Sequence, residues 1–249
     1  MLSKNKIKYI RSLELKKNRK EEHAFVAEGH KLVGDLLGHF SCRLLVATRS
    51  WMDVHPQVVA DEVIEVTQEE LTRASLQKTP QDVLAIFEQP EYPMNPEVIS
   101  QSLCLALDDV QDPGNLGTII RVADWFGIEH IFCSLGTVDV YNPKTIQATM
   151  GALARVKVHY VDLPALLQTL SMPIYVTALD GENLYQTTLS DAGVVVMGNE
   201  GNGVSDPVKA IATHSLLIPN FPVGRVTSES LNVGVATAVF CAEFRRRQL

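Results

Sequence analysis

Short apolar segments alternate regularly with helical segments from residue 103 to the end of the sequence. The apolar segments span residues 103–107, 131–133, 156–160, 174–178, 194–197 and 216–218. Helical patterns occupy residues 118–126, 144–153, 163–170, 205–211 and 228–247. Strands that are apolar on both faces and alternate with helices are typical of a parallel sheet covered on both sides. We therefore predict an α/β domain with a parallel sheet over residues 103–249.

The first 90 residues predict a smaller α/β domain. Strand-like segments occur at residues 24–27, 43–47, 63–66 and 83–87, with helical segments at 4–18, 28–37 and 68–75. Pro90, Pro93 and Pro96 then interrupt any regular element, because proline lacks a backbone N–H. We predict a small domain over residues 1–90, a linker over 91–102 and the larger domain over 103–249.

Positive charge is concentrated at the start of a chain whose net charge is −7. Residues 1–20 contain eight Lys or Arg and one acid, so this segment carries +7 and the remainder −14. Such asymmetry is typical of a basic segment that binds a polyanion, although a solvated helix would have the same composition. The residues predicted to bind the polyanion are Lys4, Lys6, Lys8, Lys16, Lys17, Arg19 and Lys20.

Composition indicates an ordinary globular protein, with 46% hydrophobic residues. No apolar run reaches the ~18–20 residues that cross a bilayer, and the N-terminus lacks the apolar core of a signal peptide. We therefore expect a cytoplasmic protein. Cysteines without CxxC or Cys/His spacing predict buried thiols and no metal site; they are Cys42, Cys104, Cys133 and Cys241.

Three polar turns follow strands of the predicted parallel sheet, at residues 108–117, 198–205 and 218–232. Ligands of open parallel sheets bind beyond the carboxyl ends of the strands, so these turns can converge on one site. Each turn alone also fits an ordinary glycine loop or helix cap. The polar side chains of interest are Asn115, Arg121, Glu200, Ser230 and Asn232.

The glycine-rich turns do not match a phosphate-binding motif. The sequence contains no GxxxxGK[ST], and GNEGNG differs from GxGxxG. Glu200 would repel a phosphate group, which favours a ligand whose amino group or adenine contacts backbone and carboxylate.

The order DPGNLGTIIRVADWFG, VVVMGNEGNGVS and IPNFPVGRVTSESLNVGVATAVF resembles the three signature motifs of the SpoU (TrmH-like) RNA ribose 2′-O-methyltransferases. Residues 4–88 resemble the small substrate-binding domain that often precedes that catalytic domain. The resemblance implies a C-terminal trefoil knot, S-adenosylmethionine as methyl donor and a homodimer formed through the knotted domain.

The resemblance also implies which residues act. Those expected in the active site are Asn115, Arg121, Glu200, Ser230 and Asn232. Those expected to contact the cofactor, largely through backbone, are Thr177, Leu179, Met197, Gly198, Asn199, Gly201, Ile218, Pro219 and Leu231. The chain departs from the family pattern in the loop over residues 220–229 and at Gly234, where the family often has Ser.

Proton removal from a ribose 2′-OH is commonly assigned in this family to the residue equivalent to Arg121. A guanidinium with a pKa above ~12 is a poor base at neutral pH. We expect Arg121 instead to bind the ribose and adjacent phosphate and to lower the pKa of the 2′-OH. Asn115 and Asn232 would orient the acceptor or Arg121, and Glu200 would fix its loop or balance the cationic site.

Several alternatives stay open. The substrate RNA is ribosomal or, alternatively, transfer RNA, and the preceding domain favours ribosomal RNA. A catalytically silent RNA-binding protein would be expected to lack motif residues, and all five are present. A doubly wound oxidoreductase would need GxGxxG with an acid about 20 residues later.

Overall fold

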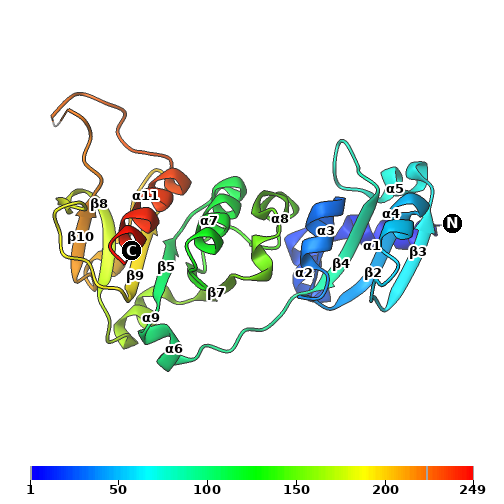
Figure 1. Cartoon of the computed structure of the whole chain (residues 1–249), viewed down its shortest axis with the longest axis horizontal. Helices are drawn as coiled ribbons and strands as arrows, with labels where there is room; N and C mark the ends of the chain where they lie inside the picture. The colour runs from blue at the N-terminus through cyan, green and yellow to red at the C-terminus, as the bar shows by residue number, and fades with distance from the viewer. Residues whose placement is uncertain (1, 223, 249) are drawn as a thin grey trace. The chain divides into compact units, whose positions relative to one another are not determined.

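The computed structural model describes residues 2–222 and 224–248. The chain divides into two compact units (Figure 1). The first contains residues 1–91 together with residues 139–154, and the second contains residues 92–138 and 155–249. Residues 139–154 belong to the segment that the sequence assigns to the larger domain, yet their contacts place them in the first unit.

The first unit is built on a four-stranded mixed sheet in the order β1-β4-β2-β3. Its strands are β1 (Ala24–Glu28), β2 (Cys42–Thr48), β3 (Glu62–Val66) and β4 (Val83–Glu88). Strand β4 runs antiparallel to β1 and β2, while β3 is parallel to β2. The helices are α1 (Lys4–Ser12), α2 (Lys16–Glu22), α3 (His30–Leu36), α4 (Arg49–Val54), α5 (Gln68–Ala74), α8 (Pro143–Thr149) and the 3₁₀ helix η1 (Ala152–Ala154).

The segment predicted as one helix over residues 4–18 forms two helices. Helix α1 ends at Ser12, and α2 begins at Lys16. Leu13 is fully buried in the turn between them. The carbonyl groups of Leu13 and Glu14 accept hydrogen bonds from the guanidinium of Arg19, which gives these groups partners outside a continuous helix.

The second unit contains a six-stranded, entirely parallel sheet in the order β10-β8-β9-β5-β6-β7. This result confirms the predicted parallel sheet. Its strands are β5 (Leu103–Asp108), β6 (His130–Ser134), β7 (Lys157–Val161), β8 (Ile174–Asn183), β9 (Gly193–Gly198) and β10 (His214–Leu217).

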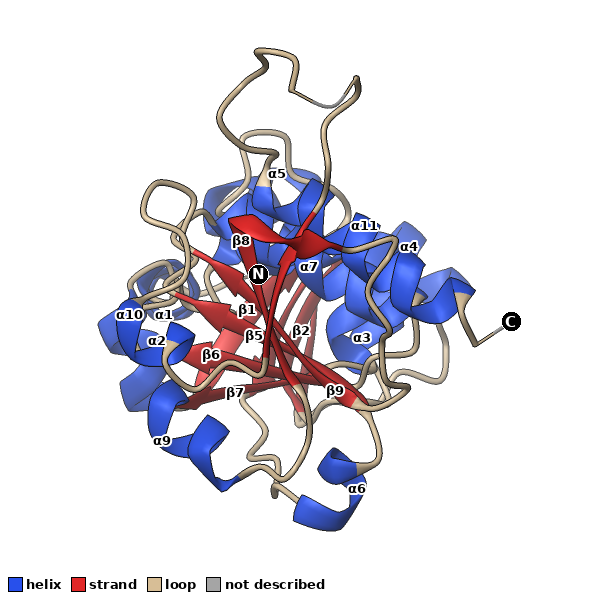
Figure 2. Cartoon of the chain, turned by 90° about the vertical axis from the view of Figure 1, so that its left-hand side faces the viewer, coloured by secondary structure: helices blue, strands red, loops and turns tan. Residues whose placement is uncertain are grey.

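Helices cover both faces of the parallel sheet (Figure 2). Helices α6 (Pro96–Ser100), α9 (Leu163–Thr169) and α10 (Asp206–Lys209) pack on one face through a shared apolar core. Helices α7 (Pro113–Trp125) and α11 (Val233–Arg246) pack against each other on the opposite face. Helix α11 begins at Val233 rather than near residue 228, because Asn232 caps it and the preceding segment is exposed.

The described residues also test the expectations about membrane-spanning helices and about the cysteines. No helix within residues 2–222 and 224–248 combines the length and apolar character that a membrane span requires. All four cysteines are buried free thiols, as predicted. Burial raises the pKa of Cys42 to about 11, which keeps this thiol protonated at neutral pH.

Candidate active site

The polar turns after β5 and β9 lie at the point where the strand order of the parallel sheet reverses, whereas the third polar turn follows the edge strand β10. Strands β5, β6 and β7 extend the sheet in one direction, and β9 and β8 extend it in the other. Strand β5 pairs directly with β9, so Asp108 lies opposite Gly198 at their carboxyl ends. Ligands of open α/β sheets bind at such switch points. The turns after β5 and β9 therefore occupy the position where this fold class binds its ligands.

A chain of hydrogen bonds joins the three turns through side chains. The amide nitrogen of Asn115 donates to Oε1 of Glu200 at 2.9 Å, and the amide nitrogen of Asn232 donates to Oδ1 of Asn115 at 2.9 Å. Oε2 of Glu200 also accepts from the backbone N–H of Gln111 at 3.4 Å. Residues from three distant parts of the sequence thus form one polar cluster.

The donor and acceptor groups of the side chains fix the direction of each hydrogen bond in this cluster. An ionised carboxylate only accepts hydrogen bonds, so Asn115 must present its NH₂ group to Glu200 and its oxygen to Asn232. Oδ1 of Asn232 in turn caps helix α11 by accepting from the backbone N–H groups of Gly234 and Val235, at 3.0 and 3.2 Å. The cap and the cluster therefore hold the Asn232 amide in one orientation.

Helix α7 is held at its start in a similar way. Asp112 is its N-cap, and its Oδ1 accepts from the backbone N–H of Asn115 at 2.8 Å. Pro113 follows at the first helical position, where its missing N–H costs nothing. This cap places Asn115 in the first turn of α7, beside the end of strand β5.

The turns after β5 and β9 are also tied to each other. Asn199 donates to the carbonyl oxygen of Asp109 at 2.8 Å, while its own side-chain oxygen accepts from the N–H groups of Gly201 and Asn202. Oδ2 of Asp108 accepts from the N–H of Ser205 at 2.7 Å. The sequence singled out both turns but not this role of Asp108 and Asp109, whose signal was two carboxylates directly after a buried strand.

Two glycines mark places where backbone segments approach very closely. A Cβ atom added to Gly198 would lie 2.2 Å from the carbonyl carbon of Gly203, and one added to Gly181 would lie 2.7 Å from the backbone of Ser215 and Leu216. No side chain fits at either position. The loop after β9 therefore folds back directly onto the end of its own strand.

Arg121 and Ser230 do not join the hydrogen-bonded cluster. Both are exposed, and among the described residues neither side chain has a hydrogen-bond or ion-pair partner. Arg121 follows Asn115 by six residues on α7, which places it about 9 Å further along the axis and roughly 120° around it. The structure thus connects three of the five predicted active-site residues; the roles of all five stay predictions.

The residues predicted to contact the cofactor gather mainly at the carboxyl edge of the sheet. Met197 and Gly198 end strand β9, Thr177 follows the part of β8 that pairs with β9, and Ile218 follows β10 directly. Of the remaining predicted residues, Asn199 and Gly201 form the loop after β9, Pro219 follows Ile218, and Leu179 and Leu231 are exposed. Leu179 is 70% exposed.

These residues fit S-adenosylmethionine. Thr177 and Met197 lie at the carboxyl ends of the paired parts of β8 and β9, and the Gly203 backbone packs so closely on Gly198 that no side chain stands there. Exposed apolar side chains at Leu179 and Leu231 offer surface for an adenine or a methionyl chain. Within residues 2–222 and 224–248, no group of three or more His, Cys, Asp or Glu could hold a metal ion.

Five of the predicted RNA-binding residues are exposed, and the other two form ion pairs within the first unit. Lys4, Lys8, Lys16, Lys17 and Lys20 are exposed on α1 and α2. Lys6 is half-buried and forms an ion pair with Glu62.

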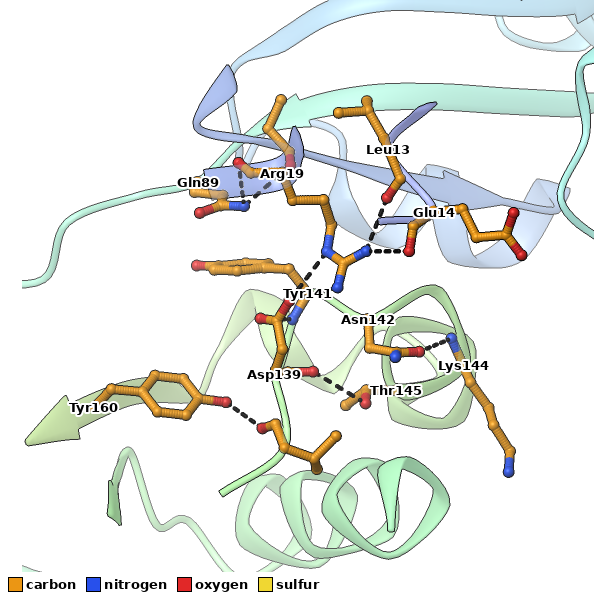
Figure 3. A network of polar contacts seen from close by, with 12 residues as sticks. Leu13, Glu14, Arg19, Gln89, Asp139, Tyr141, Asn142, Lys144, Thr145 and Tyr160 are labelled. Atoms are coloured by element: carbon orange, nitrogen blue, oxygen red, sulfur yellow. Dashed lines mark hydrogen bonds and ion pairs between the residues drawn. The ribbon is translucent and has the colours of Figure 1, made fainter. Parts of the chain in front are cut away.

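Arg19 corrects the prediction. Its side chain is buried, with 1% of the residue exposed, and its guanidinium bonds Asp139 at 2.6 Å as well as the carbonyls of Leu13 and Glu14 (Figure 3). Charge alone did not distinguish Arg19 from its neighbours. Its contacts make it a structural residue of the first unit rather than a phosphate ligand.

Comparison with known proteins supports a specific family. The sequence model of the SpoU rRNA Methylase family matches residues 102–242, and that of the MRM3-like substrate binding domain matches residues 4–85. The 23S rRNA (guanosine(2553)-2'-O)-methyltransferase RlmP of Bacillus subtilis is 30% identical, over 96% of this chain and 96% of its own length.

Solved structures agree with the sequence matches. A TrmH-family protein from Porphyromonas gingivalis is 43% identical, with a TM-score of 0.90 and 99% coverage of both chains. An AdoMet-bound rRNA methyltransferase from Sinorhizobium meliloti is 31% identical, with a TM-score of 0.88, covering 100% of this chain and 97% of that one.

Proposed function

The chain belongs to the SpoU rRNA methylase family, and on that premise we propose how its polar cluster and its basic helices serve the reaction. The protein is an S-adenosylmethionine-dependent RNA 2′-O-methyltransferase. The observation that carries the proposal is the hydrogen-bonded chain Asn232–Asn115–Glu200 at the strand switch point.

S-adenosylmethionine supplies an activated methyl group on a sulfonium, so placement of the acceptor contributes much of the remaining catalysis. In the proposal the loop after β9 and the segments after β8 and β10 hold the cofactor. Glu200 and Asn232 fix the orientation of Asn115. Asn115 then helps to orient the ribose, while Ser230 contacts the RNA.

Arg121 has a different role in the proposal. Its guanidinium stays protonated, so it does not act as the base. It binds the ribose and the neighbouring phosphate, and its charge lowers the pKa of the 2′-OH, whose proton passes to solvent water as the oxygen takes the methyl group from S-adenosylmethionine. The exposure of Arg121 and its lack of partners among the described residues support a group that is available to a substrate.

We assign large-subunit ribosomal RNA as the substrate, with transfer RNA as the alternative. The support comes from the match to a substrate-binding domain over residues 4–85 and from the B. subtilis relative, whose name states 23S rRNA. Exposed lysines on α1 and α2 supply phosphate contacts, which makes RNA affinity strongly salt-dependent. A cytoplasmic location fits this substrate.

We further propose that the protein acts as a homodimer through the second unit. Helices α7 and α11 expose apolar side chains on their outer surfaces, including Trp125, which is 85% exposed, and Val235. Arg121 lies one turn before Trp125, on the same side of α7. A second copy covering this face would bury Trp125 and place Arg121 at the interface.

The trefoil knot also stays a proposal, which the close backbone contacts at Gly181 and Gly198 support.

Mapping of 2′-O-methyl marks in RNA from cells with and without this protein tests the function. We expect one mark in large-subunit ribosomal RNA to disappear with the protein and to return with wild type but not with Asn115→Ala. Gln168→Ala, an exposed amide on α9, is the matched control and should restore the mark. Loss of a mark in transfer RNA alone would favour the alternative substrate, and no change in any RNA would contradict the proposal.

A further inference from the structure

The first unit contains a pocket that the methyl-transfer site does not use. Its volume is about 390 Å³, within the range of pockets that bind small molecules. One wall comes from strand β1 and the segment after α5, and the other comes from residues 142–147 at helix α8. Figure 3 shows Glu14, Asn142 and Lys144, which lie at this pocket, beside the Arg19 ion pair that holds the later segment.

The pocket combines apolar walls with side-chain amides. Leu76 and Pro143 are half-buried and contribute apolar surface on which a flat ring can pack, while Val26 and Ile146 line the pocket but are almost fully buried. Gln77 and Gln147 line the same space, and the amide nitrogen of Gln77 donates to Oε1 of Gln147 at 2.8 Å. This hydrogen bond uses the amide nitrogen of Gln77 and the amide oxygen of Gln147, so the oxygen of Gln77 and the nitrogen of Gln147 are the acceptor and donor that can meet the edge of a nucleobase.

A buried carboxylate, Glu28, also lines the pocket. Glu28 is only 5% exposed. One of its oxygens accepts from the backbone N–H of Leu76 at 2.8 Å, and the other is bonded to the Ser75 hydroxyl. Each carboxylate oxygen has two lone pairs, so both retain capacity for a further donor. Burial raises the pKa of Glu28, and its hydrogen bonds to Ser75 and Leu76 and the charge of Arg11 act in the opposite direction.

We propose that this pocket receives an unstacked base of the RNA, and that it prefers a base with an exocyclic amino group. This inference rests on the proposed RNA substrate. Proteins read RNA sequence mainly from bases that leave the stack and bind in pockets with apolar faces and polar edges. Glu28 accepts from an amino group, whereas the single ring N–H of uracil lies between two carbonyl oxygens that a carboxylate repels.

The surroundings of the pocket suit a polynucleotide. Lys16 and Lys17 begin helix α2 directly after Glu14, and Lys144 lies at the pocket itself; all three are exposed. Their charges offset Glu14 and attract the phosphates on either side of a bound base. The basic helices thus supply affinity that is independent of sequence, and the pocket supplies base preference.

Fluorescence anisotropy of the full chain with labelled 12-nucleotide single-stranded RNAs tests the proposal. Oligocytidylate and oligouridylate are suitable probes, because the two bases are alike in size and differ at the edge that Glu28 and the glutamines would contact. We expect the wild type to bind oligocytidylate about fivefold or more tightly than oligouridylate, the minimum that a well-formed base contact provides.

Substitutions test whether the pocket residues cause the preference for oligocytidylate over oligouridylate. Gln147→Ala changes an exposed residue of α8 and is expected to fold normally, while Gln77→Ala and Glu28→Gln change the pocket interior. Each should reduce the cytidine preference to less than twofold. Gln57→Ala, an exposed glutamine away from the pocket, should retain it. Equal binding of the two RNAs by wild type, or a preference unaltered by both Gln77→Ala and Gln147→Ala, would overturn the proposal.

Failure of the proposed methyltransferase function can be distinguished from failure of the pocket proposal. If the mapping experiment shows no missing methyl mark while the base preference is present and sensitive to Gln147→Ala, the pocket stands and the methylation assignment falls. If methylation is present and the preference is absent, only the pocket proposal is lost.

Discussion

The side-chain amide of Asn232 donates a hydrogen bond to the amide oxygen of Asn115, 117 residues earlier in the chain. The same Asn232 caps helix α11 through its own oxygen. One residue therefore has a structural role and a role in the candidate site, carried by different atoms.

Substitutions of Asn232 should separate these two roles. Aspartate keeps the capping oxygen but loses the donor to Asn115, so Asn232→Asp should retain stability and lose methyl transfer by about tenfold or more. Asn232→Ala should lose both, with about 1 kcal/mol of stability. Thermal unfolding and transfer of labelled methyl to RNA measure the two effects. Equal activity of Asn232→Asp and wild type would show that the amide pair is only structural.

Arg121→Lys should lower turnover by about tenfold or more, because an ammonium cannot bind a ribose and a phosphate as a planar guanidinium does. Arg121 is exposed, so stability should change by less than about 0.5 kcal/mol. Single-turnover rates and RNA affinity are measured together, with Arg73→Lys on α5 as the exposed control. Wild-type turnover at unchanged RNA affinity would remove the specific role of the guanidinium.

Gly198→Ala should destabilise the second unit by about 1–3 kcal/mol, as overpacking does, and should weaken S-adenosylmethionine binding, because the added Cβ would lie 2.2 Å from the backbone at Gly203. Gly34→Ala is the control. Gly34 lies in helix α3 with no atom within 4 Å of an added Cβ, so alanine should be neutral or add about 0.5–1 kcal/mol. Urea unfolding and calorimetry with the cofactor measure both effects. Unaltered cofactor affinity in Gly198→Ala would separate this turn from the cofactor site.

Arg19→Ala should cost about 3 kcal/mol of stability, because it leaves Asp139 without its cation and removes the donor from the buried carbonyl of Leu13 and the partly buried carbonyl of Glu14. Arg19→Lys should restore only part of the loss, since an ammonium cannot reach all three acceptors in the same geometry. Lys20→Ala, on the exposed side of α2, should change the free energy of unfolding by less than about 0.5 kcal/mol. Similar urea midpoints for Arg19→Ala and Lys20→Ala would contradict the structural role.

Stability should fall as pH decreases from about 6.5 to about 4. Burial lowers the pKa of His159 from 6.5 to about 4, and the positive charges of His130 and Lys157 add to this effect. Between these pH values the His159 imidazole binds a proton in the unfolded chain but not in the folded chain, so acid favours unfolding. Above pH 6.5 the imidazole is neutral in both states and does not affect stability. Burial likewise lowers the pKa of His130, which bonds His159 at 3.1 Å and has Glu129 nearby.

Urea unfolding at several pH values measures this dependence. His159→Gln should make the decline between pH 6.5 and pH 4 shallower, while His39→Gln, at an exposed position, should leave it as in wild type. An identical decline in wild type and His159→Gln would show that other groups are responsible.

The architecture of the second unit could be predicted because each of its strands has a recognisable pattern within a few consecutive residues. Each strand of the parallel sheet is a short apolar run, and burial on both faces requires that pattern wherever the strand lies in the sheet. Helix boundaries were less predictable. The helices around Ser12 and Val233 end or begin where Arg19 and Asn232 bond nearby backbone groups, and these two side chains are in turn held by partners 120 and 117 residues away in the sequence.

The sequence by itself determined the parallel sheet, the polar turns after its strands and the motifs that identify the family, because these are carried by neighbouring residues. Only the tertiary structure decided that Asn115 bonds both Glu200 and Asn232, that Arg19 is buried against Asp139, and that residues 142–147 complete a pocket with Glu28 and Gln77. Composition and periodicity specify which side chains are polar or apolar. Partners distant in sequence are chosen by the chain path, which brings together groups that must satisfy one another's hydrogen bonds once water is excluded.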